Sequence, residues 1–123
     1  MRLEDYYYRF LGCETDGGNR FVCRLQLLPD CDVYTGHFPG KPVCPGVFNL
    51  QMVKECVQRV AGHRLRMVFI KLCRLTAVAT PTDCPLLTLD IRLSASYQVE
   101  AKLSSDGKSL MTVQCMMTEV ERT

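Results

Sequence analysis

The chain has 123 residues, the size of one domain, and 47% of them are hydrophobic, so it can enclose a core of its own. With 23% charged residues and a formal net charge of +2, it lacks the strongly basic balance of a nucleic-acid-binding protein. No apolar run approaches the length that crosses a membrane. We therefore expect a single domain over residues 1–123, with neither nucleic acid nor membrane as a partner.

The chain contains eight cysteines, yet no two of them have the Cys-x-x-Cys spacing of a zinc site or a redox motif. The first residues lead into tyrosines and not into the apolar run of a signal peptide. We therefore expect reduced thiols and a cytoplasmic protein.

The N-terminal half begins with an aromatic-rich stretch over residues 1–12, which predicts a short helix or strand lying over a sheet. Residues 20–28 alternate between apolar and polar side chains, as a half-buried strand does. Residues 35–51 then combine three prolines with three glycines around His37. Proline fixes φ and lacks an N–H group, so this stretch is predicted to be a stiff loop that leads into a helix.

The helix is predicted over residues 45–61, with proline at its start and Gly62 just past its end. Its apolar side chains form one broad arc, which suits a helix held against a sheet, while Gln51 lies on the polar side. Asn49 interrupts the arc, and if it is buried its amide needs partners, which loop backbone near the helix start could supply.

Four more strands follow the helix. Alternating or fully apolar patterns place them at residues 66–75, 87–95, 97–103 and 111–117, the last two joined by a hairpin turn at Asp106-Gly107. The strand at 66–75 is apolar on both faces, as expected where a strand is covered on two sides or lies at a dimer seam. Because the helix and the later strands are segregated along the chain, the fold class is α+β with an antiparallel sheet.

The stretch His37-Phe38-Pro39-Gly40, then Pro42, then Pro45-Gly46-Val47 resembles the active-site signature of the 3-hydroxyacyl-acyl-carrier-protein dehydratases of fatty-acid synthesis. The resemblance implies a hotdog fold, in which a curved antiparallel sheet wraps one long central helix. It also implies a homodimer, or a higher oligomer built from dimers, with the active sites at the interface.

The resemblance assigns roles to three residues. His37 would take a proton from the carbon next to the thioester carbonyl, and the backbone N–H of Gly46 would polarise that carbonyl. The family carries Glu or Asp four residues after the position of Val47, to handle the departing hydroxyl, and here that residue is Gln51. An amide can orient a hydroxyl or a water but has no proton to give near neutral pH, so reduced activity is expected.

Four further residues are candidates for substrate binding because they belong to the motif or lie beside it: Phe38, Pro45, Val47 and Glu55. Glu55 lies one helical turn beyond Gln51 and could stand in for the missing acid, although its reach is long. Equally, Gln51 could simply meet water on the polar side of the helix.

Other candidate sites receive less support. Cys44 could be a nucleophile beside His37, and Cys31, His37 and Cys44 could ligate a metal, but these spacings fit no standard zinc pattern. We expect no metal. His63 is predicted to be a surface residue at the helix end.

The sequence therefore predicts a hydro-lyase that dehydrates or hydrates (3R)-3-hydroxyacyl thioesters in lipid or polyketide synthesis, without a cofactor of its own. The substrate would be carried by an acyl carrier protein or by CoA, and Arg64, Arg66, Lys71 and Arg74 could form a basic patch for such a carrier. Two alternatives remain open: a thioesterase on the same fold, and a non-catalytic subunit that binds an acyl carrier protein and pairs with an active homologue.

Overall fold

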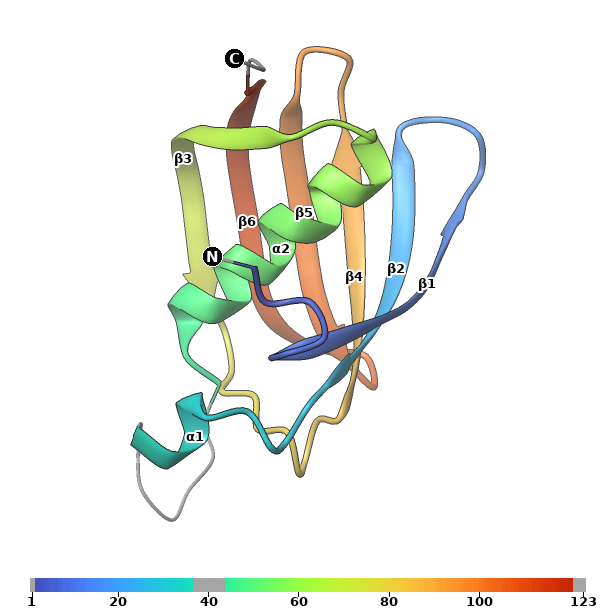
Figure 1. Ribbon diagram of the computed structural model, residues 1–123. Coiled ribbons are helices and arrows are strands. Elements are labelled where there is room, and N and C mark those ends of the chain that lie inside the picture. Colours follow the sequence, from blue (N-terminus) through green and yellow to red (C-terminus); the bar gives the residue numbers. More distant parts are fainter. Residues whose placement is uncertain (1, 37–43, 121–123) are drawn as a thin grey trace.

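A computed structural model describes residues 2–36 and 44–120, which form one antiparallel sheet with a helix across one face (Figure 1). The sheet has six strands in the order β1-β2-β4-β5-β6-β3. The strands are β1 (Tyr8–Thr15), β2 (Arg20–Leu27), β3 (Leu65–Leu75), β4 (Leu86–Leu93), β5 (Gln98–Ser105) and β6 (Lys108–Glu119). The helices are α1 (Val33–Gly36) and α2 (Gly46–Ala61). The α+β class and the antiparallel sheet are therefore as predicted.

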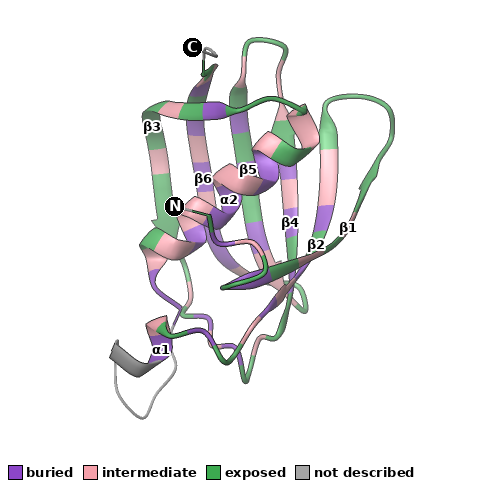
Figure 2. Ribbon diagram, viewed as in Figure 1, coloured by how far each residue is buried: buried purple, intermediate pink, exposed green. Residues whose placement is uncertain are grey.

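Helix α2 lies within one residue of its predicted bounds, and it ends where Gly62 takes a left-handed conformation with a φ of 75°. Met52, Val53, Cys56 and Val57 are completely buried and belong to the hydrophobic core. Figure 2 shows buried positions recurring along α2. These four residues are the centre of the predicted apolar arc, and they attach the helix to the sheet through the hydrophobic effect.

Strands β4, β5 and β6 form a meander, and their alternating patterns place one set of side chains under the helix. Leu89, Leu103 and Met111 lie in one row across these strands and are all buried. The hairpin between β5 and β6 turns at Asp106-Gly107, where both residues have positive φ, as its sequence predicts.

The N-terminal region departs from the prediction in two places. Residues 8–15 form a full edge strand, β1, and not a short element lying over the sheet. Only the residues before it, from Leu3 to Tyr7, cross the helix. The side chains of Leu3 and Tyr7 are completely buried. The second difference is α1, whose four residues occupy the start of the predicted loop.

Strand β3 lies at the other edge of the sheet and pairs only with β6 among the described strands. Val68, Phe69 and Ile70, consecutive residues that point to both faces, are all exposed. Covering on two sides, one of the two predicted reasons for apolar residues on both faces, is not provided by residues 2–36 and 44–120. No described helix is long and apolar enough to span a bilayer.

Candidate functional site

The candidate site begins at the N-terminus of α2, which follows Pro45. The carbonyl of Pro45 accepts the backbone N–H groups of Phe48 and Asn49, both at 3.1 Å. The N–H groups of Gly46 and Val47 lie in the first turn, where a helix has no carbonyl of its own to offer them. The Val47 side chain is 68% exposed. This end of the helix therefore presents backbone donors and the positive end of the helix dipole, as the assigned role of Gly46 requires.

A buried polar cluster lies directly beneath this helix end and comprises Tyr7, Tyr34, Cys44 and Asn49. The Tyr7 hydroxyl donates to Asn49 Oδ1 at 2.7 Å, and the Tyr34 hydroxyl lies 3.4 Å from Cys44 Sγ. The two tyrosine rings are 6.3 Å apart. Asn49 is only 4% exposed, and among the described residues the partner of its Oδ1 atom is a tyrosine of the N-terminal segment, which the sequence did not suggest.

This cluster connects the two ends of the segment that carries the histidine of the motif. Tyr34 lies in α1, just before the segment, and Cys44 follows it, with its N–H bonded to the carbonyl of Ala79 at 2.8 Å. His37 and Phe38 themselves lie outside the described residues. The described chain thus fixes both flanks of the motif against the start of α2.

Cys44 is unsuited to the nucleophilic role weighed for it. Burial raises the pKa of its thiol, so the thiol stays protonated at neutral pH despite its place before a helix N-terminus. Burial also raises the pKa of Tyr7 and of Tyr34, which keeps both hydroxyls available as donors. No metal-binding group of His, Cys, Asp or Glu occurs among residues 2–36 and 44–120, a range that omits the His37 of the candidate set.

Replacing Tyr7 by phenylalanine (Tyr7→Phe) is expected to lower the free energy of unfolding by about 1–3 kcal/mol, because it leaves the buried Asn49 carbonyl without its donor. Urea denaturation of the purified variant measures the change. The control is Tyr97→Phe, which makes the same chemical change where the hydroxyl bonds an exposed carboxylate, that of Glu119, at 2.6 Å. Equal losses of unfolding free energy in the two variants would show that the buried hydrogen bond stabilises the protein no more than the exposed one.

Gln51 and Glu55 contact each other along the exposed side of α2. Gln51 Nε2 donates to Glu55 Oε2 at 3.0 Å. Glu55 also accepts the backbone N–H groups of Leu3 at 2.7 Å and Glu4 at 2.9 Å, and the Tyr8 hydroxyl at 3.0 Å. With four donors, this carboxylate anchors the N-terminal segment to the helix, while the side chain of Gln51 lies at its edge, half-buried.

Replacing Glu55 by glutamine (Glu55→Gln) is expected to cost about 1.5–3 kcal/mol of stability, since it removes the charge that strengthens these hydrogen bonds. Amide hydrogen exchange gives the sharper readout: the N–H groups of Leu3 and Glu4 should lose protection while those of β5 keep theirs. Unchanged protection at both N-terminal amides would contradict the anchoring role. Glu100→Gln, on the exposed face of β5, is the matched control.

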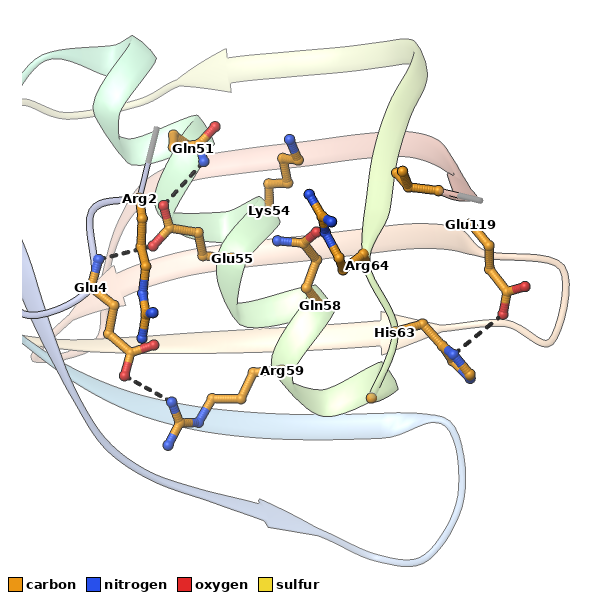
Figure 3. A pocket seen from close by; sticks show the side chains of 12 residues that line it. Arg2, Glu4, Gln51, Lys54, Glu55, Gln58, Arg59, His63, Arg64 and Glu119 are labelled. Carbon is orange, nitrogen blue, oxygen red and sulfur yellow. Dashed lines mark hydrogen bonds and ion pairs between the residues drawn. The ribbon is translucent and has the colours of Figure 1, made fainter. Parts of the chain in front are cut away.

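Beside this pair runs a polar groove of about 820 Å³ over the exposed side of α2, which we call the α2 groove (Figure 3). Arg2 and Glu4 reach it from the N-terminal segment, Lys54 and Gln58 from the helix, and Arg64 from the turn just before β3. His63 lies at its far end, exposed as predicted, with Nδ1 at 3.6 Å from a carboxylate oxygen of Glu119. The groove therefore joins Gln51 to a set of cationic side chains.

Sequence reasoning found the motif, the helix end and the proximity of Gln51 to Glu55, but it missed the buried cluster. The signals for it were the aromatic-rich N-terminus and the lone asparagine in an apolar arc. Neither signal says that Tyr7 and Asn49 meet, since 42 residues separate them along the chain.

Comparison with known proteins identifies the family. The model of the ApeI-like family, described as ApeI dehydratase, matches residues 13–113. No curated protein sequence matches the chain significantly.

Two solved structures share the fold. One is titled the dehydratase heterocomplex ApeI:P from Xenorhabdus doucetiae; it superposes with a TM-score of 0.77 at 18% identity and covers 90% of this chain and 97% of its own. The other is an uncharacterized protein from Erwinia carotovora subsp. atroseptica, with a TM-score of 0.72 at 20% identity, covering 92% and 97%. The predicted dehydratase family with a hotdog fold is confirmed: the chain belongs to the ApeI-like dehydratase family.

Proposed function

We propose that this protein removes water from (3R)-3-hydroxyacyl thioesters, or adds it in the reverse direction, with the acyl group carried on a phosphopantetheine arm of an acyl carrier protein or CoA. The observation that carries the proposal is the start of α2, where the N–H groups of Gly46 and Val47 lie in the first turn, and where Tyr34 and Cys44, on either side of His37 in the sequence, contact each other. The dehydratase family supplies the reaction class.

In the proposed reaction, His37 removes a proton from the carbon next to the thioester carbonyl, and the N–H of Gly46 stabilises the negative charge that develops on the carbonyl oxygen. The C–H electron pair becomes the new C=C bond as the C–O bond to the hydroxyl breaks. Gln51 orients the hydroxyl but has no proton to donate. The proton held by His37 must therefore be returned to the departing hydroxide, which leaves as water.

An assay with purified protein and a 3-hydroxyacyl pantetheine thioester tests this function. An increase in enoyl absorbance supports dehydration. Release of free thiol without enoyl absorbance would show instead that the protein is a thioesterase. Binding of the thioester without either signal would identify a non-catalytic subunit.

A second candidate is a catalytic pair with a homologous chain that supplies the acid missing at Gln51. Two observations favour it: the amide of Gln51 is hydrogen-bonded to Glu55, and a structural relative is titled a dehydratase heterocomplex. Activity that appears only when a homologue with Glu or Asp at this position is added would favour the pair over the homodimer.

For either assembly, the edge strand β3 is the proposed seam. An exposed edge strand with apolar side chains on both faces is a template for pairing with another strand, and antiparallel pairing of two β3 strands would cover Val68, Phe69 and Ile70. It would also bring a second α2 close to each site.

The change Ile70→Lys is therefore expected to convert the dimer to a monomer, because it places a charge in the seam. Sedimentation velocity measures the mass. Leu86→Lys changes a leucine of β4 that is more exposed than Ile70 and lies away from this edge, and it should leave the dimer intact. A variant at Ile70 that stays dimeric would place the seam elsewhere.

A further inference from the structure

The α2 groove is elongated and begins at the candidate site. It follows the helix from Gln51 to Gly62, roughly 16 Å at ~1.5 Å per residue. Figure 3 shows Gln51 and Glu55 at one end and His63 at the other, with charged side chains between them. A chain-like polar ligand could lie along it with one end at Gln51.

Part of the charge in the groove is already compensated. Arg59 Nη1 lies 2.8 Å from a carboxylate oxygen of Glu4, and His63 lies near Glu119. The carboxylate of Glu55 is hydrogen-bonded by neutral donors from the backbone, from Tyr8 and from Gln51, which stabilise its negative charge without cancelling it.

Three cations remain: Arg2, Lys54 and Arg64. None of them forms an ion pair with an acidic side chain among residues 2–36 and 44–120. Like charges that converge on one groove repel one another, and a bound anion would remove that cost. Arginine offers a planar fork that matches phosphate oxygens, and lysine adds a point charge.

We propose that the α2 groove binds the phosphate group of the substrate's carrier arm, with Lys54 and Arg64 as its principal ligands and Arg2 beside them. This inference rests on the proposed function, since it names the part of the thioester substrate that the groove holds. The amide of Gln58 lies one helical turn beyond Lys54 in the same groove, with its oxygen fixed by the N–H of Leu65 at 2.8 Å.

The test compares 4′-phosphopantetheine with pantetheine, which differs only in lacking the phosphate, by titration calorimetry on the full chain at low salt. The phosphate is expected to raise affinity about 10-fold, the value of one or two charge-assisted contacts, and added salt should erase most of the gain. The double variant Lys54→Ala/Arg64→Ala should bind both ligands equally. The matched control Lys102→Ala/Lys108→Ala removes the same charge from exposed positions of β5 and β6 outside the groove, and it should keep the gain.

Inorganic phosphate distinguishes the source of the anion. If it binds as tightly as 4′-phosphopantetheine, the groove is a site for free phosphate, and the proposal that it holds the carrier arm is wrong. Equal binding of the two pantetheines by the native chain would overturn the inference outright, while enoyl formation in the assay above would still support the dehydratase. Conversely, a phosphate-dependent gain in affinity without turnover would support the phosphate site in the groove and contradict the proposed reaction. In turnover, the double variant should raise KM for the phosphorylated substrate and leave kcat unchanged.

Discussion

Replacing Gln51 by glutamate (Gln51→Glu) is expected to raise the rate of dehydration about 100-fold, because a positioned general acid contributes ~10²–10⁴ to such a reaction. The new carboxyl would lie one turn from Glu55, whose negative charge would raise the pKa of the introduced group. A larger fraction would therefore be protonated and able to give its proton to the departing hydroxyl. Enoyl absorbance under substrate saturation measures the effect on kcat.

The matched control is Gln58→Glu, which adds the same charge to the same side of the helix two turns further on. Its side chain lines the α2 groove but lies away from the helix start, so no increase in kcat is expected. An unchanged rate in Gln51→Glu, in a variant that folds and binds substrate, would mean that position 51 does not face the reacting hydroxyl.

Replacing His37 by asparagine (His37→Asn) is expected to lower kcat by about 10²–10⁴, because the variant loses the base that takes the proton from carbon. His63→Asn changes the other histidine of the chain, which lies at the far end of α2, and should leave kcat intact. Thermal denaturation should show both variants folded. Equal activity of native protein and His37→Asn would remove the imidazole from the mechanism.

The elements that the sequence predicted well are those whose pattern is regular over many residues. Strand β4 alternates without interruption, and α2 carries a broad apolar arc with a proline before it and a glycine after it. Local patterns suffice in both because one side of each element faces the core.

Strand β1 could not be predicted in this way because its alternation breaks. The pairing register with β2 shifts between Phe10 and Gly12. Cys13, and not Gly12, is therefore the residue that pairs with an inward-facing residue of β2. At four residues, α1 is too short for any helical period to appear. β1 is held by pairing with β2, and α1 by the contact of Tyr34 with Cys44, and neither contact leaves a periodic pattern in the sequence.

The candidate site likewise has one part that the sequence predicts and one part that it does not. The motif around His37 and the start of α2 are contiguous in the sequence, so its chemistry could be predicted from residue types alone. The buried polar cluster of Tyr7, Tyr34, Cys44 and Asn49 depends on which segments the fold brings together. The cations of the α2 groove likewise come from three separate places in the chain.

Proton exchange at carbon tests the central claim most directly, because it isolates the base and the carbonyl donor from the missing acid. A saturated acyl pantetheine thioester is incubated with the protein in D₂O, and deuterium at the carbon next to the carbonyl is followed by mass spectrometry. The account predicts exchange well above the buffer rate in the native chain and in Gln51→Glu, and none in His37→Asn. Exchange at the buffer rate in the native, substrate-binding protein would contradict it.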